Sequence, residues 1–368
     1  MNPARSRHCD SHRRSEAMIK PGDLPERFAA FERPRKVFRP PREFSSDPVA
    51  TCRFRAAEGD GILIFKLRVS ALVLVTVLSS ACIRLLRPSG PVSIGIQSHE
   101  VVDEAGRRVT LPVKIHRIVS LAPNLTEIVY AVGAGDRLVG RTSYCDYPPQ
   151  AKTVTEVGDT LHPSVERIIA LKPQVVLVST ASQLENFTRQ LDAQKIAVYV
   201  TNPQSLDQVF DSMEKLGQLF GTSDVASKLV SDLRQRASAV ERATTPLKAV
   251  RVFYQVSDEP LYTIGREAYL TDLIKRAGGI SVTADVPTAF PRFSDEAALA
   301  SKPDAIILPT GGSMGNANSN VAPALKKSPA ALNNRVHKIN DDLLSRPGPR
   351  LVDGLEQLAR ALHPESFK

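Results

Sequence analysis

The sequence has no tryptophan and only four cysteines among its 368 residues. Three of these, Cys9, Cys52 and Cys82, precede residue 92, which leaves Cys145 as the single thiol of the remaining chain. A disulfide framework or a paired-cysteine metal site is therefore excluded from that part. The sequence has only one apolar run, a short one near residue 70. A multi-span membrane protein is therefore excluded.

The net charge of +9 comes almost entirely from residues 1–92, and the rest of the chain has little net charge. Residues 1–60 hold 13 Lys and Arg against 9 Asp and Glu, and residues 61–92 hold 4 basic residues and no acid. The remaining residues hold 31 basic against 30 acidic side chains. The body is nearly neutral, so we expect no nucleic-acid partner.

The N-terminal region is typical of a targeting segment rather than of a folded domain. Residues 1–60 are rich in Arg and Pro without an apolar period, which predicts a disordered extension or a start codon assigned too far upstream. Residues 61–82 combine a basic start with the apolar run Val69–Val77, as in a signal peptide. The following Ser79-Ser80-Ala81-Cys82 resembles a lipoprotein lipobox, which implies lipidation of Cys82 and attachment to a membrane; an uncleaved anchor is the alternative. Residues 83–100 are predicted to be a tether.

From residue 101 onward, short β-branched runs alternate with amphipathic segments, which predicts an α/β fold. The pattern divides into an N-terminal lobe at residues 101–222, a linking helix at 223–245 and a C-terminal lobe at 246–368. The linking helix has neither Gly nor Pro from Ser223 to Thr244, so we expect it to be rigid. Val225 and Leu233 are among the apolar positions expected to face the core.

An internal repeat supports the two-lobe organisation. Val165–Pro173 and Asp295–Pro303 each contain a helical segment that ends in Lys-Pro before a strand. Aligning the two Lys-Pro pairs places Glu166 on Glu296, both in a first helical turn. These acids either complement the helix dipole or form a two-point docking surface. Earlier in the chain, the spacing of Asn124 and Glu127 predicts a helix capping box.

Two segments carry a resemblance to a known family. Arg117–Glu127, with the sequence RIVSLAPNLTE, resembles the first strand and helix of class III periplasmic substrate-binding proteins. These proteins serve ATP-binding-cassette (ABC) importers of cobalamin, haem and iron-siderophores. Ser143–Pro149, with the sequence SYCDYPP, is similar to cobalamin-binding members. The resemblance implies two Rossmann-like lobes joined by a single long rigid helix, a ligand cleft between the lobes, and binding without chemistry or a resident cofactor.

The same resemblance implies roles for individual residues. The position that contacts a corrin falls on Tyr144, and Tyr262 and Phe290 fall near the cleft. Glu166 and Glu296 would dock on arginines of a dimeric permease, a contact that carboxylates make well. A second-lobe loop that contacts cobalamin in the family falls on Asp342, Leu343, Leu344, Ser345 and Arg346.

Other readings remain open at this level. A cobalamin-binding member of the family lines its cleft with tryptophans. The corresponding positions of this sequence fall near Thr160 and Ser179, and the sequence has no tryptophan there. A haem protein would use Tyr144 as an axial ligand, and a ferric-siderophore receptor would grip its anion with Arg346 and Arg266. An exported enzyme is less favoured, because the chain has no HExxH or Walker A motif and its GxSxG match, Gly311–Gly315, is interpreted as a Gly-rich loop at the cleft rim. The histidines are scattered, so no metal site is expected.

Overall fold

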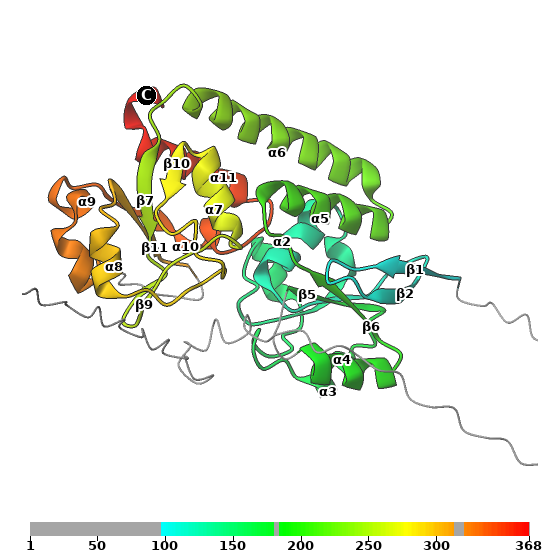
Figure 1. Ribbon diagram of the computed structural model, residues 1–368. Helices are drawn as coiled ribbons and strands as arrows, with labels where there is room; N and C mark the ends of the chain where they lie inside the picture. Colours follow the sequence, from blue (N-terminus) through cyan, green and yellow to red (C-terminus); the bar gives the residue numbers. More distant parts are fainter. Residues whose placement is uncertain (1–96, 180–183, 313–319, 368) are drawn as a thin grey trace, which may run out of the picture. The chain divides into compact units, whose positions relative to one another are not determined.

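The computed structural model describes residues 97–179, 184–312 and 320–367 (Figure 1). The predictions for residues 1–60 and 61–82, including Cys82, lie outside the described residues. Strands β1 (Ser98–Val102) and β2 (Arg108–Pro112) form an antiparallel hairpin. Because β1 begins inside residues 83–100, the prediction of a tether up to residue 100 is corrected.

The N-terminal lobe contains a four-stranded parallel sheet with the order β4-β3-β5-β6. Its strands are β3 (Ile118–Ser120), β4 (Leu138–Arg141), β5 (Val175–Ser179) and β6 (Ala197–Thr201). Its helices are α2 (Pro123–Ala131), α3 (Val165–Ala170), α4 (Leu184–Ala193) and α5 (Leu206–Leu219). Ile118 and Leu177 pack into the core beside α2 and α5, whereas Val119 and Val176 belong to a second core with Ile168 of α3. Alternating strand residues thus build two layers of helices around one sheet.

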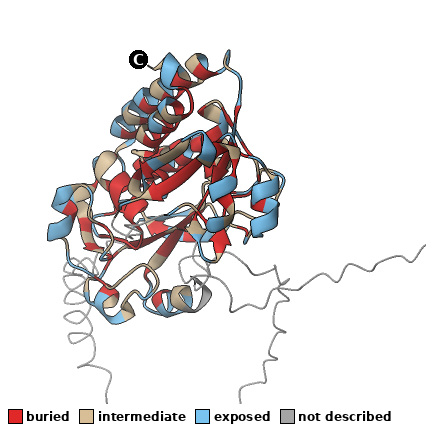
Figure 2. Ribbon diagram, turned by 90° about the vertical axis from the view of Figure 1, so that its left-hand side faces the viewer, coloured by how far each residue is buried: buried red, intermediate tan, exposed pale blue. Residues whose placement is uncertain are grey.

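The C-terminal lobe repeats this plan with a parallel sheet of order β10-β7-β11-β12. The strands are β7 (Val250–Tyr254), β10 (Gly279–Ser281), β11 (Ala305–Thr310) and β12 (Val336–Asn340), with the hairpin β8 (Ser257–Asp258) and β9 (Leu261–Tyr262) beside them. The helices are α7 (Tyr269–Arg276), α8 (Asp295–Ala300), α9 (Pro329–Leu332), α10 (Asp341–Leu344) and α11 (Leu351–Leu362). Buried residues concentrate in the strands and on the inner faces of the helices (Figure 2).

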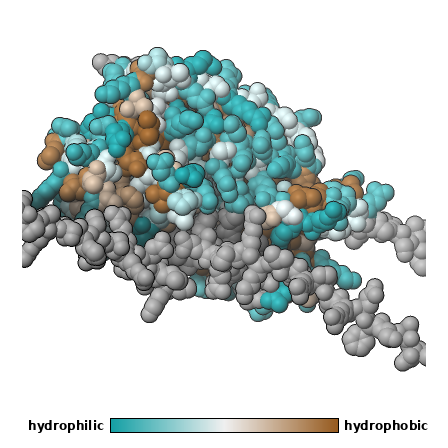
Figure 3. All heavy atoms as spheres, viewed as in Figure 1, coloured by the Kyte–Doolittle hydropathy of each residue, from teal (hydrophilic) through white to brown (hydrophobic). Residues whose placement is uncertain are grey.

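Helix α6 (Ser223–Thr244) joins the lobes and has 22 residues, about 33 Å at the usual rise. Its buried residues include Ala226, Val230 and Leu233, spaced by three or four positions. Val225 is exposed, so its predicted core position was wrong. The opposite face is polar, and hydrophilic side chains cover the upper surface where α6 lies (Figure 3).

The lobes share more than the linking helix. One continuous hydrophobic cluster includes Ile128 and Phe210 of the N-terminal lobe, Leu233 of α6, and Leu273 and Leu355 of the C-terminal lobe. The link predicted as a single helix is therefore reinforced by packing on both of its sides.

The two sheets confirm the internal repeat down to backbone detail. Lys172 and Lys302, which precede the prolines, both adopt left-handed backbone angles, with φ of 46° and 44°. The residues after the prolines then donate from their backbone nitrogens to equivalent carbonyls: Gln174 to Arg117, and Asp304 to Arg251. The lobes are two copies of one supersecondary plan.

Candidate functional site at the lobe boundary

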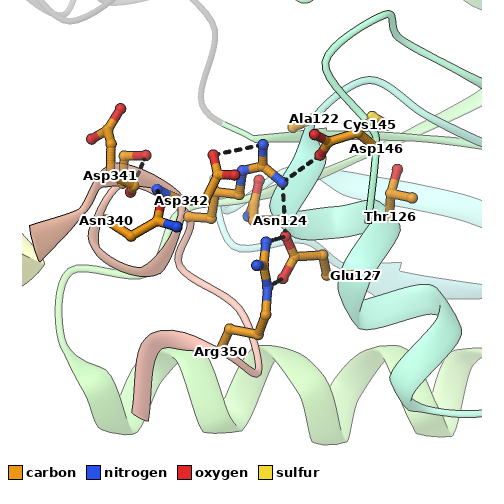
Figure 4. Close-up of polar contacts among 12 residues, drawn as sticks. Ala122, Asn124, Thr126, Glu127, Cys145, Asp146, Asn340, Asp341, Asp342 and Arg350 are labelled. Atoms are coloured by element: carbon orange, nitrogen blue, oxygen red, sulfur yellow. Dashed lines mark hydrogen bonds and ion pairs between the residues drawn. The ribbon is translucent and has the colours of Figure 1, made fainter. Parts of the chain in front are cut away.

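Five charged residues from both lobes meet at the boundary and are called here the inter-lobe cluster: Glu127, Asp146, Asp342, Arg346 and Arg350 (Figure 4). Arg346 Nη1 donates to Glu127 Oε1 at 3.0 Å and to Asp146 Oδ1 at 2.9 Å. Its Nη2 lies 2.8 Å from Asp342 Oδ1. Arg350 forms a bidentate pair with Glu127, at 2.9 Å from Nε and 2.6 Å from Nη2. Charge-assisted pairs of this geometry are strong and directional.

Glu127 comes from α2 and was misread as part of a capping box. The N-cap of α2 is Ala122, and no side chain caps the helix. Asn124 instead donates from Nδ2 to the carbonyl of Pro347 at 3.3 Å, and the Glu127 carboxylate reaches Arg346, 219 positions away. Both predicted capping residues therefore act between the lobes, where only the tertiary fold brings their partners.

The arginines come from the segment that joins α10 to α11. This segment runs against α2: a Cβ placed on Gly348 would lie 3.4 Å from the carbonyl oxygen of Asn124. The side chain of Arg346 is only 3% exposed, whereas that of Arg350 is 18% exposed. A guanidinium as buried as that of Arg346 requires carboxylate partners, and it has them from three directions.

Tyr147 extends the cluster toward solvent. Its ring is 43% exposed, and the guanidinium carbon of Arg350 lies 4.0 Å from the ring centroid. Burial lowers the pKa of Arg350, but the hydrogen bonds and charge of Glu127 outweigh this and the pKa is raised. Arg350 is thus a fixed cation held between a carboxylate and an aromatic face.

The predicted ligand residues separate into two groups. Tyr144 is half-buried on the loop that carries Asp146 and Tyr147. Asp342 belongs to the cluster, and Ser345 is exposed beside it, donating to the Asp341 carbonyl at 2.8 Å. Arg346 pairs with Asp146 and Asp342 and so joins the two segments that carry these residues, while their contact with a ligand stays a prediction.

The second group packs inside the C-terminal lobe. Leu344 and Tyr262 are 0% and 1% exposed and belong to the hydrophobic core, so the structure gives them a packing role in place of the predicted ligand contact. Leu343 is also buried, at 9% exposure, and Phe290 is half-buried against the core. Arg346 is present at the boundary but is covered by its partners rather than presented to a ligand.

The two predicted docking acids are exposed and occupy matched places. Glu166 lies in the first turn of α3 and Glu296 in the first turn of α8. Each helix is capped by a serine: Ser164 accepts from the Arg167 nitrogen, and Ser294 from the Ala297 nitrogen. The matched serine caps place the two acids at the same position of their respective helices.

Other candidate features lie elsewhere or are inert. A cavity of about 600 Å³ lies beside α6, α7 and β10, and no cluster residue lines it. Cys145 is buried, which raises the pKa of its thiol and keeps it protonated. Within the described ranges, no three His, Cys, Asp or Glu side chains gather as metal ligands, and no helix is long and apolar enough to cross a membrane.

Sequence reasoning missed Glu127, Arg350 and Tyr147. A usable signal existed in the repeat, because Leu125-Thr126-Glu127 on α2 matches Leu270-Thr271-Asp272 on α7. Each acid precedes by six residues a glycine in the left-handed region, Gly133 with φ 82° and Gly278 with φ 80°. A matched acid on two matched helices is a sign of a shared tertiary role.

Comparison with known proteins identifies the family. A family model described as periplasmic binding protein matches residues 118–343, more than half of the chain. The chain belongs to the periplasmic binding protein family. The resemblance found in the sequence is thereby confirmed, together with the two-lobed α/β fold and the expectation of a solute-binding protein rather than an enzyme.

Three members of the family illustrate its range. An uncharacterized ABC transporter substrate-binding lipoprotein, YvrC of Bacillus subtilis, is 34% identical over 72% of this chain and 86% of its own. The crystal structure of the periplasmic vitamin B12 binding protein BtuF of Vibrio cholerae is 31% identical, with a TM-score of 0.62, and covers 70% of this chain and 100% of its own. The periplasmic heme-binding protein RhuT from Roseiflexus has 26% identity and a TM-score of 0.61, over 68% of this chain and 99% of its own.

Proposed function

We propose that this periplasmic binding protein captures cobalamin or a related corrinoid outside the cytoplasm and delivers it to the permease of an ABC importer. The relatives support both parts of the proposal, since one is named as an ABC transporter substrate-binding lipoprotein and another as a vitamin B12-binding protein. Ligand binding between the lobes is part of this proposal, and it is supported by the general preference of ligand sites for domain interfaces.

The observation that carries the ligand assignment is the loop Ser143–Pro149 beside the inter-lobe cluster. The loop carries Tyr144 and the exposed Tyr147 on either side of Asp146 in the sequence, and the Asp146 carboxylate shares Arg346 with Asp342. A corrin has a broad apolar face and a fringe of amide groups. Aromatic rings suit the face, and carboxylate oxygens accept hydrogen bonds from the amides.

The test is a titration of the full chain with cyanocobalamin, haemin and a ferric siderophore, followed by absorbance and calorimetry. We expect one cyanocobalamin to bind per chain and to be recovered unchanged. Binding of haemin or the siderophore without binding of cyanocobalamin would reject the corrinoid and leave the family assignment intact.

Haem is the second candidate, because a phenol at Tyr144 beside the lobe boundary is a possible axial ligand and the RhuT structure has the same fold. This alternative predicts an iron–phenolate absorbance band on adding haemin to the full chain. The band should disappear in Tyr144→Phe, which keeps the ring and removes only the oxygen. A corrinoid protein should give no such band.

Docking on the permease is proposed for Glu166 and Glu296. Their matched, serine-capped positions on two repeats suit a permease with two equivalent halves, and an exposed carboxylate pairs well with an arginine fork.

Attachment to the membrane is proposed through residues 61–82, by lipidation at Cys82 or by an uncleaved anchor. The intact mass of the native protein and of Cys82→Ala distinguishes the two. A lipid mass that disappears in the variant supports lipidation, whereas an unmodified N-terminus in both supports the anchor.

A further inference from the structure

The inter-lobe cluster exposes its two aspartates more than the arginine that they share. The side chains of Asp146 and Asp342 are 30% and 16% exposed, whereas the Arg346 side chain between them is 3% exposed. One acid comes from each lobe, so the guanidinium is covered from both sides. Arg350 is 18% exposed but lies against Glu127 and the Tyr147 ring, so Asp146 is the most exposed charged side chain of the cluster.

The arginines of the cluster are already engaged by these acids. Arg346 donates to three carboxylates, and Arg350 makes a bidentate pair with Glu127 while Tyr147 covers its face. Three carboxylates and two guanidiniums leave the cluster one negative charge. Gripping an anion needs an arginine fork that faces the ligand, and these forks face carboxylates instead.

We infer that Asp146 and Asp342 select the ligand by charge, so that the site accepts neutral or cationic amide-bearing macrocycles and rejects anionic chelates. This inference rests on the proposed function, in which the ligand binds at the lobe boundary. Rejection has a direct physical cause: a ligand carboxylate close to Asp146 or Asp342 is repelled at short range in a partly desolvated site. A ligand amide at the same place donates its N–H to the aspartate oxygen.

Arg266 is the other arginine predicted to bind an anionic siderophore. It does not supply the cationic contact that the cluster lacks. It is exposed, and its Nη2 donates to the carbonyl of Asp285 at 3.0 Å. Its charge is therefore screened by solvent, unlike the partly buried acids of the cluster.

The decisive experiment compares ligands that differ in one charge. Cyanocobalamin carries peripheral amides, and its separated monocarboxylates each replace one amide by a carboxylate of nearly the same shape. For the full chain we expect at least one monocarboxylate to bind about tenfold more weakly or worse, as expected for a close like-charge contact. This difference in affinity between cyanocobalamin and the monocarboxylate, the affinity gap, should become smaller in Asp342→Asn and in Asp146→Asn, which keep the side-chain shape.

The matched control is Asp232→Asn, which removes one negative charge from an exposed position on α6. It changes the net charge of the chain equally but should leave the gap unchanged. Two aspartate variants guard against a folding defect in one, and circular dichroism checks each of them.

A second pair of ligands distinguishes a failure of charge selection from a failure of the proposed function. Haemin carries two propionate groups, and its dimethyl ester is the same macrocycle without their charge. Equal binding of cyanocobalamin and all its monocarboxylates, or an unchanged gap in both aspartate variants, overturns charge selection and leaves the corrinoid function standing. Binding of the haemin ester in preference to haemin, without corrinoid binding, supports charge selection and rejects the corrinoid. Preference for haemin over its ester without corrinoid binding, or no binding of any probe, overturns both.

Discussion

Replacement of Glu127 tests the structural role of the inter-lobe cluster. Its carboxylate is 2% exposed and accepts three hydrogen bonds from two arginines. Removing one partner of a buried ion pair costs about 3–5 kcal/mol when the remaining charge is left alone. Here Arg346 keeps Asp146 and Asp342, and Arg350 is partly hydrated, so the lower end applies.

We therefore expect Glu127→Ala to lower the free energy of unfolding by about 3 kcal/mol, and Glu127→Gln by about half of that because the amide oxygen still accepts one hydrogen bond. For a body of this size, about 3 kcal/mol corresponds to a decrease in melting temperature of roughly 6–12 °C. Denaturant unfolding and calorimetry of the full chain measure both quantities.

The matched control is Glu156→Gln in the same lobe. Glu156 pairs with Arg141 at 3.3 Å, but its side chain is 48% exposed, so its loss should cost less than about 1 kcal/mol. A double-mutant cycle of Glu127→Gln with Arg350→Gln should give a coupling energy of about 1–3 kcal/mol. If Glu127→Gln unfolds like the control, or if the coupling is zero, the cluster does not hold the lobes together.

Three further predictions concern the ligand, the permease and pH. Tyr144→Ala should weaken cyanocobalamin binding by about 1–3 kcal/mol in calorimetry, through lost aromatic burial and a lost hydroxyl contact; a large loss of ligand-free stability would instead assign the ring to packing. Glu166→Ala with Glu296→Ala should abolish uptake by permease-containing vesicles and leave affinity unchanged, each single variant acting partially; normal uptake by the double variant would make both acids simple helix-terminal charges. Burial, and then the charge of Arg335, lower the pKa of His337. Stability should accordingly fall as the pH decreases below about 6.5, because the unfolded chain takes the proton more readily, and His337→Gln should flatten this slope in urea titrations; an identical slope would contradict it.

Most of the fold was predictable from local pattern. The β-branched run Val175–Ser179 forms β5 and the amphipathic segment Leu184–Ala193 forms α4, because apolar periodicity and strand propensity act within each segment. Strand β10 (Gly279–Ser281) was not predicted. It is only three residues long and begins with glycine, so it has no periodic signal, and its pairing with β7 defines it.

The candidate site was predictable only in part, for a different reason. Glu127 fits a local capping rule, yet its partners Arg346 and Arg350 lie more than 200 positions away. Local reasoning assigns a carboxylate near a helix start to that helix, and it cannot weigh a distant arginine against the helix dipole. The family resemblance placed Arg346 at the lobe boundary and implied a ligand contact for it, whereas its guanidinium pairs with three carboxylates of the protein itself.

The repeat gives the cluster a counterpart across the molecule. Asp272 of α7, which matches Glu127 of α2, accepts from the backbone nitrogen of Leu206 at 3.1 Å, and its neighbour Arg276 reaches Asp207 at 2.7 Å. Leu206 and Asp207 begin α5 of the other lobe. Each lobe thus sends a carboxylate from the same helix position into the opposite lobe. Two such contacts at separate places resist rotation of the lobes better than a single linking helix can. Opening the boundary would separate the charged partners at both contacts, and it would also separate the shared apolar core. The two lobes are therefore held at a fixed separation before any ligand arrives, which would favour binding to a preformed site if the proposed residues contact the ligand.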